Sequence, residues 1–459
     1  MFNFSHQGRR PKHHRKNRLF HFCASLCFGF IPLGPLYAAD LPAPVTAANF
    51  LEVDYDKAKI GQLLFYDKIL SGNRNIACVT CHHPKFGSSD GLSLGVGEGG
   101  NGIGPDRTPG EGNERILKRI PRNAQGLWNL GAKEVSVVFH DGRLSVDDIY
   151  ENGFNSPAEE WLPSGLDSIL AAQSIFPLTS MAEMAGSKGE NQVAGAVNDR
   201  IDLGWPIIAK RVRIIPEYGS AFVSAFDHIT APEEVTIVEI ANALAAFMTL
   251  EFQSFDSPFD RYLAGNRTAL SGQQLQGMEL FFGTANCATC HSGQFLSDQE
   301  FHALALPPFG PGRTRRFDPA VRDVGRMGES DDLEDAYRFR TPMLRNASLT
   351  APYGHNGAYP TLRRMVEHHV DPMQELQQWS PRDANLISVP WLAAADFVVQ
   401  DDRLEMDRLE RHLDIEPIEL SDAEIDALVA FLEALTGTDS VTSPVFGSPT
   451  AVPSGLLEM

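Results

Sequence analysis

The chain of 459 residues is poor in positive charge and in long apolar segments. It contains 39 Lys and Arg against 59 Asp and Glu, a formal net charge of −20. A protein with this excess of negative charge is repelled by nucleic acid and by anionic membranes, which argues against both as partners. After residue 39 no stretch is long and apolar enough to span a bilayer. Apolar residues still make up 43% of the chain, which excludes disorder, collagen and coiled coil, and the length favours two domains.

The charge balance is reversed in residues 1–39, which contain six Lys or Arg and no Asp or Glu. A mostly apolar run from Leu19 to Tyr37 follows the basic start, and small residues follow at Ala38 and Ala39. This is the order of regions in a secretory signal peptide. An uncleaved membrane anchor is the alternative, but proline and glycine near the end of the run argue against it. We predict a signal peptide cleaved near Ala38-Ala39, no stable membrane anchor and a periplasmic mature protein.

Cysteine is scarce, and beyond the signal region it occurs in two copies of one pattern, C-V-T-C-H at 78–82 and C-A-T-C-H at 287–291. C-x-x-C-H is the attachment signature of haem c, in which two thiols bond to the porphyrin and the His binds iron. Two disulfides, a zinc site or a thioredoxin-like pair are the alternatives. The His after the second cysteine, present twice, favours haem. The pattern predicts two covalently bound haem c groups, attached at Cys78, Cys81, Cys287 and Cys290, with His82 and His291 as iron ligands.

Strand-like alternation is also scarce, so we expect a mainly α fold with long loops and little strand. Helical periodicity is strong over 233–251, and Ser421 with Glu424 predicts a capped helix over 421–435. Residues 87–113 are rich in glycine and are expected to form a long loop. The predicted organisation is an N-terminal haem domain over 40–255, a C-terminal haem domain over 266–440 and a flexible tail over 441–459.

Outside the haem motifs, both halves resemble the bacterial di-haem cytochrome c peroxidase and MauG family over roughly residues 50–440. The resemblance is carried by R-N-A at 122–124, F-H-D-G-R at 139–143, A-E-M at 182–184 and FRTPMLRNASLTAPYGHNG at 339–357. It implies two cytochrome-c-like helical domains that face each other. It further implies that the N-terminal haem reacts with peroxide, and that the C-terminal haem takes electrons from a donor or stores an oxidising equivalent.

The resemblance implies that peroxide binds the first haem on the side opposite His82, so this side must lack a protein ligand. No His or Met occurs between His83 and His140, so the loop after the motif lacks a strong ligand, and we expect this haem to be open. A cap from elsewhere, such as His140 or a Met, is the alternative.

Peroxide cleavage also needs a group that moves a proton between the two oxygens. The resemblance implies Glu183 for this role, because a Met follows it, with Glu159 and Glu160 as alternatives.

The sixth ligand of the second haem is a Met or Tyr in the family, and the matching position here is His369. Leu362, Met365, Val366 and His369 share one helical face. His368 lies about 100° around the helix axis and is expected to face elsewhere. The alternatives are Met365 as the ligand, His368 as the ligand, or no ligand at all.

The resemblance also implies groups between the haems. A calcium ion is expected at Asn123, Thr350 and Pro352, in keeping with the oxygen ligands that this cation prefers. His140 stands where the family usually has a Trp that relays electrons; His is harder to oxidise, so it either relays electrons or bridges propionates or backbone. The haem propionates have candidate partners in Arg338, Arg340 and Arg345, although solvated charges are an equal alternative.

These observations predict a periplasmic di-haem peroxidase that reduces hydrogen peroxide to water. Its electrons are expected from a small cytochrome c or a cupredoxin. One alternative is a MauG-like oxidase that modifies a partner protein. The other is a di-haem electron carrier without catalysis, which requires both irons to be six-coordinate.

Overall fold

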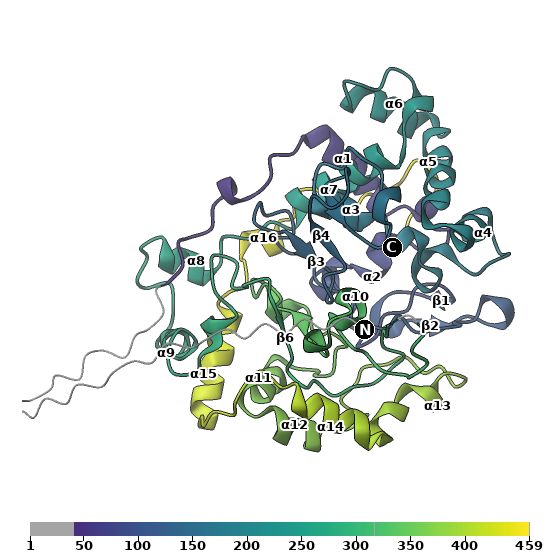
Figure 1. Cartoon of the computed structure of the whole chain (residues 1–459). Helices are drawn as coiled ribbons and strands as arrows, with labels where there is room; N and C mark the ends of the chain where they lie inside the picture. The colour runs from purple at the N-terminus through teal and green to yellow at the C-terminus, as the bar shows by residue number, and fades with distance from the viewer. Residues whose placement is uncertain (1–40, 316, 459) are drawn as a thin grey trace, which may run out of the picture. The chain divides into compact units, whose positions relative to one another are not determined.

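Helices account for most of the regular structure, as the scarcity of strand-like alternation predicts. The computed structural model describes residues 41–315 and 317–458 (Figure 1). The predicted signal peptide and its cleavage site lie outside the described residues. Within the described part, no helix is long and apolar enough to cross a membrane. The antiparallel strands form small sheets of order β1-β2, β3-β4-β5 and β6-β7, with bounds Gly100–Asn101, Thr108–Pro109, Val137–Val138, Leu144–Val146, Phe154–Asn155, Phe301–His302 and Phe339–Arg340.

The helices divide between a first half, residues 41–255, and a second half, residues 256–458. The first half contains α1 (Tyr55–Phe65), α2 (Cys78–Cys81), α3 (Ile169–Ser174), α4 (Gln192–Asp199), α5 (Trp205–Arg213), α6 (Pro216–Ala225) and α7 (Ile237–Glu251). The second half contains α8 (Pro258–Leu263), α9 (Gly272–Phe281), α10 (Met327–Ser330), α11 (Leu362–Val370), α12 (Pro372–Gln378), α13 (Ala393–Asp396), α14 (Arg403–Arg411), α15 (Asp422–Glu433) and α16 (Asp439–Thr442).

One pair of packed helices stands at the centre of each half, and the two pairs are built alike. In the first half α1 packs on α7, and a Cβ added to Gly61 would lie 1.9 Å from the Ala243 carbonyl oxygen. In the second half α9 packs on α15, and a Cβ added to Gly277 would lie 1.9 Å from the Ala427 carbonyl oxygen. Glycine therefore allows the same close backbone approach in both pairs. The first helix of each pair precedes a C-x-x-C-H motif.

Local sequence fixes where the two partner helices begin. The predicted helix over 421–435 is observed as α15, and Ser421 with Glu424 forms its capping box. The helix expected from residue 233 begins later, as α7, because Thr236 with Glu239 forms the capping box there. Residues 232–234 form a separate short 3-10 turn.

The hydrophobic core does not follow the expected domain boundaries closely. The largest apolar cluster belongs to the first half, yet it includes Phe295 of the second half. The Phe295 ring meets the Phe50 ring edge to face at 5.6 Å between centroids. The second half has a core of its own around α9 and α15, which contains Phe259, Phe281 and Phe431. The division into two haem domains remains a prediction.

The C-terminal tail is packed, which corrects the expectation of a flexible segment over 441–459. The yellow end of the chain runs back to the first half (Figure 1). The backbone N–H groups of Phe446 and Gly447 donate to the Glu251 carboxylate at 2.8 and 2.9 Å. Val452 is buried, and Glu458 accepts a hydrogen bond from the Thr80 hydroxyl. The polar composition of the tail did not predict these contacts, because they are few and depend on specific residues.

Candidate haem centres

The first C-x-x-C-H motif opens into a cavity of about 410 Å³, here called the first cavity. Cys78 and Cys81 are the ends of the single turn of α2, and both line this cavity with His82. The His82 Nδ1–H donates a hydrogen bond of 3.0 Å to the Ser88 carbonyl oxygen, which leaves Nε2 available to a metal. Burial lowers the pKa of His82 and favours the neutral ring, the form that coordinates iron.

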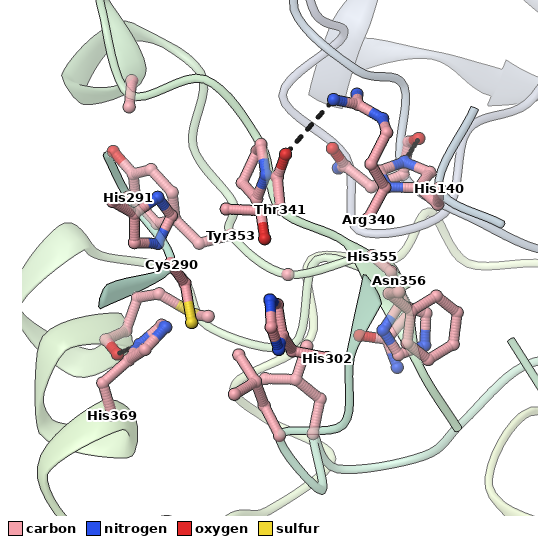
Figure 2. Close-up of a pocket in the computed structure, with 18 of the residues that line it drawn as sticks. His140, Cys290, His291, His302, Arg340, Thr341, Tyr353, His355, Asn356 and His369 are labelled. Atoms are coloured by element: carbon pink, nitrogen blue, oxygen red, sulfur yellow. Dashed lines mark hydrogen bonds between the residues drawn. The ribbon is translucent and has the colours of Figure 1, made fainter. Parts of the chain in front are cut away.

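The second motif opens into a cavity of about 940 Å³, here called the second cavity (Figure 2). Cys287, Cys290 and His291 line it. The His291 Nδ1–H donates to the Leu296 carbonyl oxygen at 3.1 Å, so Nε2 is again available. Burial, with His369 as the next cause, lowers the pKa of His291 to about 4. Each motif therefore presents two thiols and one neutral imidazole to a cavity, the donor set that covalently attached haem requires.

His369 of α11 faces His291 across the second cavity (Figure 2). The two ring centroids are 6.3 Å apart. An iron bonded at roughly 2 Å to one nitrogen of each ring needs a centroid separation of roughly 6 Å. The His369 Nδ1–H donates to the Met365 carbonyl oxygen at 2.8 Å, which leaves Nε2 available. The pair fits two axial ligands of one haem iron.

The two alternatives to His369 are placed differently. His368 is buried, its Nε2–H donates to the Leu304 carbonyl oxygen at 2.7 Å, and its Nδ1 accepts from the Tyr359 hydroxyl at 2.8 Å. Both of its ring nitrogens are therefore used within the protein. Met365 lines the second cavity, but its helix presents His369 to the same cavity one turn later.

Glu183 lies in the wall of the first cavity, on a π-helical turn over Met181–Ala185. Burial raises the pKa of its carboxyl, while the Arg143 and Arg313 guanidinium groups and a hydrogen bond from Ser180 act in the opposite direction. A carboxyl with a raised pKa keeps its proton to a higher pH than an exposed carboxyl does, which suits a group that accepts and returns protons. The structure thus places this acid in the same cavity as the first haem motif.

The other candidate acids are not in this position. Glu159 and Glu160 lie on an exposed 3-10 turn and do not line the first cavity. The Glu183 turn is held by the glycine-rich loop, since the backbone N–H of Glu98 donates to the Ala182 carbonyl oxygen at 3.1 Å. Residues 88–96 of that loop are buried, although the predicted loop is poor in apolar residues. Its tight turns and buried Leu and Val side chains explain the difference.

Asn123 and His140 line both cavities and so form the wall between them. The His140 Nε2–H donates to the Asn123 carbonyl oxygen at 3.1 Å. Burial and the Arg122 charge lower the pKa of His140 to about 4, so the ring is neutral at ordinary pH. Thr350 and Pro352, the other expected calcium ligands, also line the second cavity. The calcium site remains a prediction.

A buried ion cluster next to this wall was not predicted. Arg122 contacts Asp141 at 2.5 Å and binds Asp323 through two nitrogens at 2.8 Å each. Arg143 and Arg313 also contact Asp141, at 3.1 and 3.4 Å. These charges hold the pKa of Asp141 well below its usual range even though burial acts to raise it. Arg122 and Asp323 are 201 residues apart in the sequence, so no local sequence pattern could predict this pair.

The three arginines expected at propionates all line the second cavity, with different partners. Arg338 contacts Asp414 at 2.9 Å, and Arg345 contacts Asp260 at 2.6 Å. Arg340 donates to the Phe139 and Thr341 carbonyl oxygens, each at 3.2 Å.

A second possible donor group in the second cavity consists of Cys290, Asp298 and His302, whose ligand atoms lie within 4.8 Å of one another. The His302 Nε2 pairs with the Asp298 carboxylate at 2.9 Å. A metal at this group would need the Cys290 thiolate. Haem attachment consumes that thiol, so the two uses of Cys290 exclude each other.

Comparisons with known proteins agree with this geometry. A family model described as di-haem cytochrome c peroxidase matches residues 55–268. Cytochrome-c peroxidase IdrP1 of Denitromonas iodatirespirans is 30% identical over 357 residues, which cover 73% of this chain and 77% of that protein. Methylamine utilization protein MauG of Paracoccus denitrificans is 28% identical over 88% of this chain and 94% of its own. A MauG-like protein associated with microbial copper homeostasis has a similar structure, with a TM-score of 0.58 at 25% identity, covering 90% of this chain and 98% of that one.

Proposed function

The chain belongs to the di-haem cytochrome c peroxidase family and is an oxidoreductase of that kind, and on this premise we propose that it reduces hydrogen peroxide to water in the first cavity. The observation that carries the proposal is the placement of Glu183 in the cavity that also contains Cys78, Cys81 and His82. Family membership implies two haems, and we propose that both are attached covalently through the four motif cysteines. Bound haem supplies the redox-active iron and the electron path.

The residues of the first cavity have separate roles in binding the haem and in moving protons. His82 would hold the iron of the first haem, with its ring fixed by the hydrogen bond to the Ser88 carbonyl oxygen. Glu183 accepts a proton from peroxide and returns it to the departing oxygen, a transfer that its raised pKa favours. Arg143 and Arg313 keep that pKa from rising further. No strong ligand from the loop after His82 competes with peroxide, so we propose an open haem there.

The second cavity is suited to electron transfer rather than to peroxide. His291 and His369 would both hold the iron of the second haem, which would leave no position there for peroxide. This centre would supply electrons to the first cavity. We propose a small cytochrome c or a cupredoxin as the donor, a periplasmic location after cleavage near Ala38-Ala39, and a calcium ion held by Asn123, Thr350 and Pro352.

A MauG-like oxidase that modifies a partner protein is the second candidate. The long match to MauG of Paracoccus denitrificans favours it. His140 argues against it, because imidazole is harder to oxidise than the indole that the family usually has there. Its low pKa and its hydrogen bond to Asn123 favour a structural role in the wall.

Steady-state turnover of the holoprotein tests the proposal. Reduced small cytochrome c and hydrogen peroxide are mixed with it, and donor oxidation is followed by absorbance. Reduction of one peroxide to two waters takes two electrons and two protons, so two donor molecules are expected to be oxidised per peroxide. Absence of donor oxidation with cytochromes, cupredoxins and artificial donors, although both haems are present, would contradict a peroxidase.

A further inference from the structure

We propose that Arg340 binds a propionate of the second haem and ties that propionate to the wall of the first cavity. The inference deepens the proposed function, on whose two haems it rests. It concerns an arginine whose charge has no ion-pair partner within residues 41–315 and 317–458. The backbone and side chain of this residue both donate hydrogen bonds to the first half. These two features together allow Arg340 to bind an anion in the second cavity and to hydrogen-bond the wall of the first cavity.

The charge of Arg340 has no counter-ion among the described residues. The residue is half-buried, and its side chain lines the second cavity. It donates only to carbonyl oxygens, those of Phe139 and Thr341. Burial is the cause that lowers its pKa, to about 10. A cation that is partly removed from water and has no paired anion is unfavourable, so an anion is expected in the cavity that Arg340 lines.

The neighbouring arginines do not need such an anion. Arg338 is paired with Asp414, and its side chain is 33% exposed. Arg345 is fully buried, but Asp260 lies 2.6 Å from it. A propionate is a carboxylate, the group that a planar guanidinium binds best. Of these three arginines, Arg340 therefore has the strongest requirement for the anion that haem brings.

Arg340 is also attached to the wall between the cavities. Its backbone N–H donates to the His140 carbonyl oxygen at 2.8 Å, and its Nε donates to the Phe139 carbonyl oxygen at 3.2 Å. Figure 2 shows Arg340 beside His140 at one side of the second cavity. Phe139 lines the first cavity and has a φ of 65°, a left-handed conformation that is uncommon for a bulky residue. The bonds from Arg340 help to hold this conformation.

The consequence is electrostatic. A cation next to a haem propionate offsets negative charge and favours the reduced, less positive iron. Loss of the Arg340 charge is therefore expected to lower the reduction potential of the second haem. The potential of the first haem is expected to change much less.

The test compares Arg340→Gln with Arg338→Gln in the holoprotein, by spectroelectrochemical titration of both haems. Arg338 is a matched control, because it lines the same cavity two residues away and already has a carboxylate partner. We expect a lower second-haem potential in Arg340→Gln, a near wild-type value in Arg338→Gln and partial recovery in Arg340→Lys. Equal potentials in Arg340→Gln and the wild type would overturn the assignment.

Haem content, measured as the pyridine haemochrome, keeps the two proposals apart. If Arg340→Gln loses the second haem while Arg340→Lys and Arg338→Gln keep both, the need for a cation at this position is supported. If Arg340→Lys and Arg338→Gln lose haem to the same extent as Arg340→Gln, the specific role of Arg340 is overturned. A wild-type protein without covalent haem would instead contradict the proposed function itself.

Discussion

In the proposed function, the reaction with peroxide depends on the carboxyl of Glu183. Glu183→Gln is expected to slow the reaction of the first haem with peroxide by about 10²–10⁴-fold, the scale of a general acid–base group. Stopped-flow absorbance measures this rate. Glu160→Gln is the control, because Glu160 lies outside the first cavity. A normal rate in Glu183→Gln with a slow rate in Glu160→Gln would transfer the role to that residue.

The same reaction has a predicted pH dependence. Burial raises the pKa of Glu183 above 4.5, and the carboxylate form accepts the peroxide proton. This form is lost as the pH falls through the raised pKa, so the wild-type rate is expected to decline at a pH above 4.5. Glu183→Gln lacks the titrating group and should lack this decline. A decline of the same shape in both proteins would assign it to another group.

In the proposed function, His369 is the second protein ligand of the second haem iron. His369→Ala is expected to convert that haem from low-spin to high-spin, because one axial imidazole is removed. Met365→Leu should leave it low-spin. Near-infrared magnetic circular dichroism of the ferric protein reads both results. A thioether-to-iron charge-transfer band in the wild type would show instead that Met365 is the ligand.

The sequence predicted site residues where a contiguous motif or a short segment resembling the family marks them. The haem motifs are contiguous, and Glu183 and His369 were expected from such segments; their roles remain predictions. Arg122 and Asp323 are 201 residues apart, so their pairing depends on the fold. The same holds for Arg340. The structure pairs Arg338 with Asp414 and Arg345 with Asp260, whereas it gives Arg340 no carboxylate partner among the described residues.

Among the structural elements, the two helix pairs impose the strictest steric demand. Gly277→Ala is expected to destabilise the protein by about 1–3 kcal/mol, because the new methyl group would meet the Ala427 carbonyl oxygen. Gly272→Ala in the same helix is the control, since nothing lies within 4 Å of its added Cβ. Denaturant unfolding measures both. Equal stability of the two variants would contradict the close approach of α9 and α15.

Sequence predicted these elements better than their surroundings. Periodicity found α7, and a capping box found α15, because both signals are local. The start of α7 was predicted too early because the capping box of Thr236 and Glu239 was overlooked. The glycine-rich loop was recognised as a loop, but its burial and its support of the Glu183 turn depend on contacts that its own composition does not reveal.

At the scale of the whole molecule, the C-terminal tail joins the end of the chain to the first haem motif. Deletion of residues 445–459 is expected to lower the free energy of unfolding by roughly 2–5 kcal/mol, since it removes buried Val452 and several hydrogen bonds. Thermal unfolding followed by circular dichroism measures the loss. Deletion of the last residue alone is the control. An unchanged transition after the longer deletion would restore the expectation of a loose tail.

The mainly α fold and the family were predicted correctly from sequence. Both follow from features spread over the chain, namely few strands, two haem motifs and a long segment over 339–357 that resembles the family. The packing of the tail was predicted wrongly, because polar composition does not exclude specific contacts. The domain boundaries remain a prediction, since Phe295 joins the core of the other half.

The central claim is that one haem is open to peroxide while the other is closed. Electron paramagnetic resonance of the resting ferric holoprotein tests it most directly, before and after one equivalent of hydrogen peroxide. The account predicts equal amounts of one high-spin and one low-spin haem, with the high-spin signal lost on addition of peroxide. Two low-spin haems that do not respond to peroxide would contradict it and would identify an electron carrier.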